Sequence, residues 1–283
     1  MDSHEWRSPV FHQYSNLALN GMKKKRCPFC TKPLIKKNSR EHIIPKWILE
    51  YLQIADVKIS PTHTSSKDNS IVSKREHVLT NLVSGGICVD CNNGWMSSLE
   101  TENMGTLKGL MSGSLCLADL NLNQKYILAR WAFKTALVLN YGSNFHKNIP
   151  LEHFQHLFEH QDSLPARVCV TAYQHQSKGS FDWIQGLPWV CEGNKRQFNK
   201  EKTSQLLAKG WKIGFQFGEL FLITAYNPFP DCLFLLWRSV LMPLYPSSGT
   251  VGWFEREQSF QEENWKILTE LGMGVQLLHK GEN

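Results

Sequence analysis

Several features that would assign a chain to a special class are absent from this sequence. It contains no run of about eighteen apolar residues, so we expect neither a membrane-spanning helix nor a membrane partner. The first residues lack the apolar core of a secretory signal, and we therefore expect a cytoplasmic, reducing location. Internal repeats and low-complexity segments are also missing. The hydrophobic content of 42% and the aromatic content of 11% instead indicate a folded globular protein.

Acidic residues are missing from residues 22–40, although basic residues are frequent there. The formal net charge of the whole chain is only +6, so this stretch is locally far more basic than the rest. Its eight basic residues are Lys23, Lys24, Lys25, Arg26, Lys32, Lys36, Lys37 and Arg40. Such a stretch can be an ordinary solvated face, or it can contact a phosphate backbone. The composition alone leaves both interpretations open.

Four of the eight cysteines form two close pairs, Cys27-x-x-Cys30 and Cys88-x-x-Cys91. The others are isolated among apolar neighbours and are interpreted as core thiols: Cys116, Cys169, Cys191 and Cys232. In a reducing location, paired CxxC sequences indicate zinc rather than disulfides. Four thiolates complete a tetrahedral structural Zn²⁺ site. A small module with a long polar loop has little core, so the metal would supply much of its folding free energy.

Hydrophobic periodicity predicts a mixture of helices and strands, the α+β class. Apolar stripes of helical spacing predict helices over residues 46–52, 92–102, 122–141 and 151–158. Shorter β-like runs predict strands over residues 168–173, 211–217, 219–226 and 232–240. The polar residues 55–76 are expected to form a surface loop, and the Gly- and Ser-bearing residues 104–113 to end the preceding helix.

The periodicity and the positions of the cysteine pairs predict an N-terminal arm, a first module and a second domain. Residues 1–21 show no clear period and are expected to form an N-terminal arm. Residues 22–113 contain both cysteine pairs and are expected to form one module. Residues 114–283 are expected to form a second α+β domain.

A carboxylate and a histidine are adjacent between the two cysteine pairs, in Arg40-Glu41-His42-Ile43-Ile44-Pro45. A carboxylate binds Mg²⁺ or a similar hard cation, and a histidine can take a proton from an attacking water. Because adjacent side chains of a strand face opposite ways, we expect only one of the two to point at a site unless the strand is bulged. The alternative is that Glu41 and His42 are ordinary surface residues.

The three segments occur in a specific order: Cys27/Cys30, then Glu41-His42-Ile43-Ile44-Pro45, then Cys88-Val89-Asp90-Cys91-Asn92. In this order they resemble the HNH (ββα-metal) endonuclease family, most closely its endonuclease VII-type members. The resemblance covers residues 22–102. It implies a zinc-stapled ββα-metal module that uses a second divalent ion, Mg²⁺ or Mn²⁺, for catalysis.

The resemblance also implies a role for each matching residue. Glu41 takes the position of the metal-binding aspartate usual in the family, and His42 takes that of the general base. Asn92, at the start of a helix, takes the position of the second metal ligand. The asparagine that orients the base is expected to be Asn81, with Asn93 as the alternative.

A nuclease of this kind hydrolyses phosphodiester bonds, and we expect double-stranded DNA as the substrate, in restriction or phage defence. The expected nucleic-acid-binding residues are Lys23, Lys24, Lys25 and Arg40. The second domain would then supply target choice, regulation, a protein partner or a homo-oligomer. The alternative is a zinc-stapled nucleic-acid-binding or regulatory protein without catalysis, in which Glu41 and His42 are structural.

Two further groups of residues allow more than one interpretation. Glu100 follows Asn92 by about two helical turns and is interpreted as a solvated helix residue, with a metal ligand as the alternative. His153, His156 and His160 have helical spacing and are interpreted as a polar helix face rather than a metal site.

Overall fold

The computed structural model describes residues 25–34, 39, 41–64, 70–143, 147–175, 181–186, 189–190, 200–246, 251–254 and 273–277. Helices and strands are both abundant, so the predicted α+β class is confirmed. In these ranges no helix is both long enough and apolar enough to cross a membrane. Lys23, Lys24, Arg40, Cys191 and the predicted arm over residues 1–21 lie outside the described residues.

The first half of the described chain is made of short strands and helices around one long helix. In chain order these are β1 (Glu41–His42), α1 (Lys46–Tyr51), β2 (Lys58–Ile59), β3 (Thr62–Thr64), β4 (Ile71–Lys74), β5 (His77–Val78), η1 (Leu79–Asn81), β6 (Val83–Ser84), α2 (Val89–Cys91), η2 (Asn92–Met96), α3 (Ser97–Met111) and η3 (Leu117–Asp119). Strands β1 and β6 pair antiparallel, with Glu41 opposite Ser84 and His42 opposite Val83. The predicted helix over residues 46–52 corresponds to α1.

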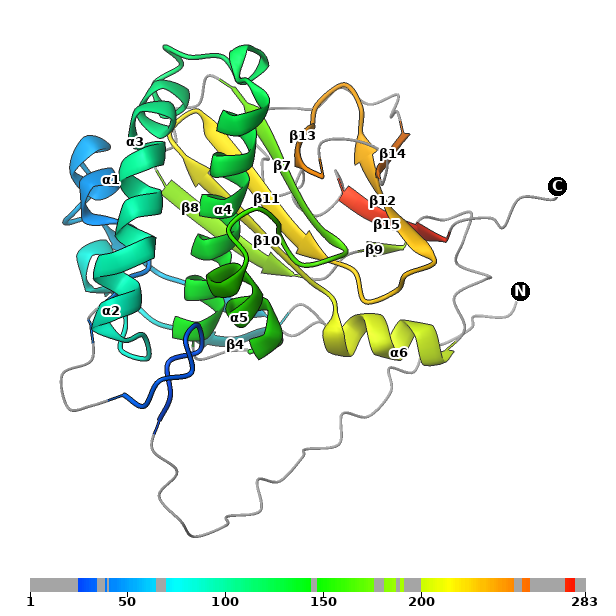
Figure 1. The fold of residues 1–283 in the computed structure, drawn as a ribbon, viewed down its shortest axis with the longest axis horizontal. Helices are drawn as coiled ribbons and strands as arrows, with labels where there is room; N and C mark the ends of the chain where they lie inside the picture. The colour runs from blue at the N-terminus through cyan, green and yellow to red at the C-terminus, as the bar shows by residue number, and fades with distance from the viewer. Residues whose placement is uncertain are drawn as a thin grey trace, which may run out of the picture.

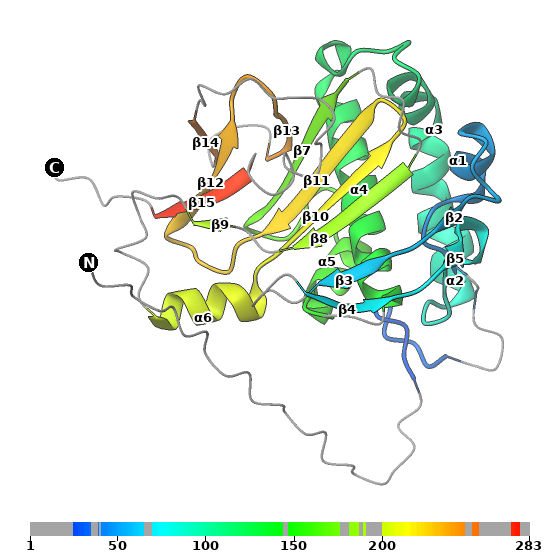
Figure 2. The same ribbon diagram turned by 180° about the vertical axis from the view of Figure 1, so that it is seen from behind.

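The polar residues 55–76 contain strands, so the predicted surface loop is wrong. Strand β2 pairs with β5, and β3 pairs with β4, in two antiparallel ladders. Figure 2 shows β3 and β4 below the large sheet and β2 and β5 at its right, under α1. Ile71 and Val72 in β4 are 65% and 60% exposed. Because neither face of β4 is buried, its sequence carries no alternation of apolar and polar residues from which a strand could be predicted.

The helix after the second cysteine pair is longer than predicted, because α3 continues to Met111. Leu107, Leu110 and Met111 are buried and extend its apolar stripe through the glycines of residues 104–113. A Cβ atom on Gly109 would lie 2.8 Å from the Cβ atom of Leu115. Gly109 therefore lets Leu115, in the turn that follows α3, approach the helix closely, and it does not end the helix.

The second half contains two long helices and most of the strands. In chain order these are α4 (Leu122–Gly142), α5 (Leu151–Glu159), β7 (Val168–Gln174), β8 (Phe181–Gly186), β9 (Trp189–Val190), α6 (Lys200–Lys209), β10 (Trp211–Phe217), β11 (Leu220–Tyr226), β12 (Cys232–Trp237), β13 (Met242–Tyr245), β14 (Val251–Phe254) and β15 (Met273–Leu277). Helices α4 and α5 and strands β7, β10, β11 and β12 confirm the predicted elements. Asn121 and Gln124 form a capping box at the start of α4.

The strands form two larger sheets. A five-stranded sheet has the order β13-β7-β11-β10-β8, and a four-stranded sheet has the order β14-β12-β15-β9. Figure 1 shows α3, α4 and α5 in front of the five-stranded sheet, and Figure 2 shows them behind it. Ring contacts join α4 to this sheet, with Trp131 and Phe217 centroids 5.5 Å apart and Phe133 and Trp211 centroids 6.0 Å apart.

One hydrophobic core extends through both predicted domains. Its buried side chains begin at Cys27 and end at Leu244, and they include residues of α1, α3, α4 and the five-stranded sheet. Helix α4 contacts both α3 and β6. The boundary between residues 113 and 114 stays a prediction, but α4 supports the β1–β6 pair and the helix that follows it.

Candidate functional site

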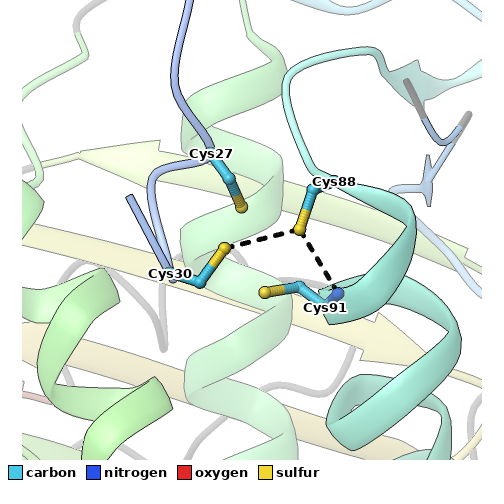
Figure 3. A group of neighbouring side chains, drawn as sticks. All are labelled: Cys27, Cys30, Cys88 and Cys91. Carbon is cyan, nitrogen blue, oxygen red and sulfur yellow. Dashed lines mark hydrogen bonds between the residues drawn. The ribbon is translucent and has the colours of Figure 1, made fainter. Parts of the chain in front are cut away.

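The two cysteine pairs come together in the structure. The sulfur atoms of Cys27, Cys30, Cys88 and Cys91 all lie within 4.8 Å of one another (Figure 3). The Sγ atoms of Cys30 and Cys88 are 3.5 Å apart. Zinc–sulfur bonds of about 2.3 Å would place tetrahedral sulfur ligands about 3.8 Å apart. The cysteine cluster can therefore hold a metal ion, and it is the only group of three or more potential ligands in the described part of the chain.

Two short backbone turns build the cysteine cluster. In the first turn the backbone N–H of Thr31 donates to the carbonyl oxygen of Cys27 at 3.0 Å, with Thr31 at a positive φ of 60°. The second begins α2, where Cys88 is the N-cap and its Sγ accepts from the backbone N–H of Cys91 at 3.4 Å. Each pair is thus fixed by local hydrogen bonds, and only the approach of the two turns depends on the rest of the fold.

Charge in the cysteine cluster is unevenly distributed between the thiols. Hydrogen bonding to Cys91 lowers the pKa of Cys27 to about 4. Hydrogen bonding to Cys27, together with burial, raises the pKa of Cys91, and burial raises that of Cys88. A soft cation such as Zn²⁺ binds thiolates, so its binding would release the protons that the metal-free cluster retains.

Strand β1 places Glu41 and His42 on opposite sides. Glu41 is only 6% exposed, whereas His42 is half-buried. This difference follows the alternation of side chains along a strand, and it agrees with the expectation that only one of the two points inward. The carboxylate is directed toward the interior, and the imidazole remains accessible to solvent.

Two charged groups from other elements act electrostatically on Glu41, namely Glu100 of α3 and Lys134 of α4. The fully buried Nζ of Lys134 donates to Oε1 of Glu100 at 2.6 Å. Burial raises the pKa of Glu41 to about 7, while the charge of Lys134 opposes this rise and that of Glu100 adds to it. Glu41, Glu100 and Lys134 are called the buried charge cluster below.

Glu100 is not the solvated helix residue that its sequence context suggested. Its side chain is only 19% exposed, because the α3 face that carries it packs against α4. The apolar sequence of α4 gave little sign that Lys134 would lie inside the protein. A charged residue in such a helix usually extends to the surface. Here the ammonium is buried because it pairs with Glu100 and also lies over the Trp131 ring, 5.9 Å from its centroid.

The asparagines of the candidate site differ in exposure. Asn92 is half-buried in η2, a π-helical turn in which Gly94 departs from helical geometry at φ −91° and ψ −114°. Turns of this kind occur frequently at functional sites. Asn81, at the end of η1, and Asn93 are both exposed. The metal-ligand role of Asn92 and the choice between Asn81 and Asn93 stay predictions.

The expected nucleic-acid-binding residues fall mostly outside the described ranges, except for Lys25. Lys25 is exposed, and its backbone accepts a hydrogen bond from the N–H of Leu34 at 2.8 Å. It lies two residues before Cys27, so a phosphate contact there would be adjacent to the cysteine cluster.

The three histidines of α5 do not form one group. His153 is buried with its ring 4.5 Å from that of Tyr226, and burial lowers its pKa to about 4. The rings of His156 and His160 lie 4.6 Å apart. The predicted polar face is therefore wrong for His153, which packs into the core.

Comparison with protein-family models, with curated proteins and with solved structures found no match to this chain. The resemblance to HNH endonucleases therefore stays a prediction from the sequence motifs.

Proposed function

We propose that this protein is a metal-dependent HNH endonuclease that hydrolyses phosphodiester bonds in DNA. The observation that carries the proposal is the position of the Glu41-His42 strand. This strand pairs with β6, and the chain continues from β6 through Cys88 and Cys91 directly into a helix. The order strand, strand, helix beside four clustered cysteines is what a zinc-stapled ββα-metal module requires.

The proposal assigns two kinds of metal ion to two groups of ligand atoms, sulfur for one and oxygen for the other. The four thiolates suit Zn²⁺, and their role is structural, because four protein ligands leave no position open for substrate. The carboxylate of Glu41 suits a hard cation such as Mg²⁺ or Mn²⁺, with Asn92 as the second proposed ligand. When bound there, the hard cation would stabilise charge that develops on the phosphate and on the leaving oxygen.

The protein's own residues supply the remaining chemistry. His42 takes the proton from the attacking water, a role for which its partly exposed ring is accessible. Lys25 and the basic residues around it attract the phosphate backbone. Restriction or phage defence is the proposed setting, with the second half of the chain supplying target choice, regulation or oligomerisation.

A second function is favoured by one observation, the deep burial of Glu41, on which the charge of Lys134 acts. A carboxylate in that environment can stabilise the fold without binding a catalytic metal. The protein would then be a zinc-stapled nucleic-acid-binding protein without catalysis.

The two functions are separated by nicking of supercoiled plasmid with Mg²⁺ or Mn²⁺. We expect His42→Ala to lower the nicking rate by at least about 100-fold, the usual contribution of a general base, while zinc content and folding persist. His77→Ala is the matched control, because His77 is another half-buried histidine on a two-residue strand and lies outside the proposed site. Equal nicking by His42→Ala would exclude the assigned base. Binding of plasmid without cleavage under either metal would favour the second function.

A further inference from the structure

The strands β2 to β5 form one two-stranded ribbon that the sequence did not predict. One register runs through the β2–β5 and β3–β4 ladders, so the two ladders continue one another. Between them the backbone N–H of Arg75 donates to the carbonyl oxygen of Pro61 at 3.4 Å. Residues 58–64 and 70–78, which the structure describes, are called the β ribbon below. At about 3.3 Å for each residue of a strand, the β ribbon is roughly 20 Å long.

The β ribbon begins and ends next to the strands of the proposed site. Helix α1 joins it to β1, and η1 joins it to β6, so one short element separates each end from the β1–β6 pair. Hydrogen bonds close its base. The backbone N–H of Leu79 donates to the carbonyl oxygen of Val57 at 3.1 Å, and the hydroxyl of Thr80 donates to that of Ala55 at 3.2 Å. A partner bound along the β ribbon is therefore held near the proposed site.

Two adjacent aliphatic side chains of the β ribbon are exposed to solvent. Ile71 is 65% exposed and Val72 is 60% exposed. The register shifts beside them, because His63 pairs with Ser73 and Thr64 with Ile71, and Val72 is the extra residue of a bulge. Bulges change the direction of a side chain and are frequent next to functional sites. Adjacent aliphatic side chains with this exposure favour contact with a partner.

The charge of the β ribbon favours a polyanion as that partner. Lys74 and Arg75 are exposed and have no ion pair among the described residues. Glu76 is the only acidic residue of the β ribbon, and its carboxylate pairs with Lys58 at 2.9 Å. The β ribbon is also rich in hydroxyl residues, namely Ser60, Thr62, Thr64, Ser70 and Ser73. Lysine, arginine, serine and threonine are residues that commonly contact phosphate oxygens of DNA.

A protein partner fits the β ribbon less well than DNA does. The core of a protein interface is enriched in Phe, Tyr and Trp, and the β ribbon contains none of them. Charged residues such as Lys74 and Arg75 also oppose edge-to-edge pairing with the strand of a second copy. The major groove of B-DNA is about 12 Å wide, admits a two-stranded ribbon and displays the methyl groups of thymine.

We infer that the β ribbon binds in the major groove of double-stranded DNA, with Lys74 and Arg75 on phosphates and Ile71 and Val72 against thymine methyl groups. The inference rests on the proposed function for the identity of the partner. It assigns DNA binding to a segment whose polar sequence suggested only a surface loop. The β ribbon then holds the duplex next to strands β1 and β6.

Salt dependence tests the phosphate contacts. Fluorescence anisotropy measures binding of the full zinc-loaded chain to a short labelled duplex without added Mg²⁺ or Mn²⁺. Lys74→Gln/Arg75→Gln removes two phosphate contacts, so the slope of log Kd against log salt should fall by about two and the Kd should rise at least about tenfold at about 0.1 M salt. Lys209→Gln/Arg238→Gln removes an exposed lysine and an exposed arginine from the second half and should leave the slope unchanged. An unchanged slope in the ribbon variant, or an equal fall in the control, would overturn the inference.

Thymine methyl groups test the apolar contacts. An A/T-rich duplex is compared with the same duplex carrying deoxyuridine in place of thymidine, which removes only the methyl group in the major groove. The wild type should bind the thymine duplex about fourfold more tightly for each methyl group contacted. Ile71→Thr/Val72→Thr keeps β-branched residues suited to a strand and should lose this preference, whereas Leu122→Thr, at a 72% exposed leucine of α4, should retain it. Equal binding of both duplexes by the wild type would refute the inference.

Every variant should keep the circular dichroism and zinc content of the wild type, because all the substituted side chains are exposed. Pairing of the β ribbon with a second copy is the competing outcome. In that case Ile71→Thr/Val72→Thr would lower self-association in analytical ultracentrifugation and leave the Kd for both duplexes unchanged. That combination is incompatible with the inference.

Failure of the proposed function gives a different result. If the ribbon variants lose duplex binding as described but the wild type does not nick plasmid with Mg²⁺ or Mn²⁺, the DNA-binding ribbon stands and the nuclease proposal fails. If the wild type nicks plasmid and the ribbon variants bind the duplex as tightly as it does, the nuclease proposal stands and the role of the β ribbon is refuted.

Discussion

The cysteine cluster and the buried charge cluster lie in the same core but are built in different ways. The cysteine cluster takes its four groups from two turns that local hydrogen bonds fix. The buried charge cluster takes one group each from β1, α3 and α4, and only the packing of those elements brings the groups together. Because its turns are local, the cysteine cluster can form early and stabilise the fold around it. The buried charge cluster forms only after β1, α3 and α4 have packed together.

Of the changes to the two clusters, loss of one thiolate should have the largest effect on folding. Cys88→Ser removes a ligand and the N-cap sulfur of α2, so we expect loss of bound zinc and unfolding of residues 25–111. Zinc content and circular dichroism measure the outcome. Cys116→Ser is the control, because Cys116 lies outside the cluster. It is exposed, so its interpretation as a core thiol was wrong. A stable Cys88→Ser protein that keeps a full complement of zinc would contradict a four-cysteine site.

Breaking the ion pair of the buried charge cluster should have a smaller but still large effect. Glu100→Ala leaves the Lys134 ammonium buried without its partner, which should lower the free energy of unfolding by about 3–5 kcal/mol. The exposed pair of Lys32 and Asp90, whose side chains are 64% and 72% exposed, provides the control. Asp90→Ala should change the free energy of unfolding far less than Glu100→Ala, because water screens that pair.

Urea denaturation of zinc-loaded protein measures both changes. Equal losses in Glu100→Ala and Asp90→Ala would show that the contact between Glu100 and Lys134 does not hold in solution. The buried charge cluster would then not depend on the packing of α3 against α4, as the account requires.

The smallest expected effect concerns His153, which is buried and has no counter-ion among the residues that the structure describes. Its pKa of about 4 lies below the ordinary value of 6.5, because burial and the nearby positive charges of His156 and Arg167 disfavour the imidazolium. The unfolded chain therefore binds more protons between these values. Stability should be complete above pH 6.5 and fall toward pH 4, by at most about 3 kcal/mol.

His153→Phe keeps an aromatic ring against Tyr226 and should remove this part of the pH dependence. Urea denaturation between pH 4 and pH 7 gives the slope for each protein. His160→Phe, at an exposed position of the same segment, should keep the wild-type slope. An unchanged slope in His153→Phe would show that its imidazole is solvated.

Local signals in the sequence predicted much of this structure. The spacing of the cysteines predicted their cluster, because each CxxC turn is short and has few alternative geometries. The apolar stripe of α4 and the pair of strands on either side of Gly218 were also predictable, since periodicity and turn residues are local. Gly218 has a positive φ of 57°, and a Cβ atom there would lie 2.5 Å from the carbonyl oxygen of Met111.

The features that the sequence did not predict depend on long-range contacts. Lys134 and Glu100 are 34 residues apart, and neither has a neighbour in the sequence that reveals their pairing. Strand β4 is mostly exposed, so it lacks the alternation that predicts a strand. Periodicity did not show that His153 faces inward, since a histidine fits either face of an amphipathic helix.

The proposed nuclease is tested most directly by plasmid nicking with wild type and His42→Ala compared in the same Mn²⁺ buffer at equal zinc content. The predicted result is accumulation of nicked circles with the wild-type protein and a rate at least about 100-fold lower with the variant. Nicking at the same rate by both proteins would contradict the site, and absence of nicking by the wild type would contradict the function.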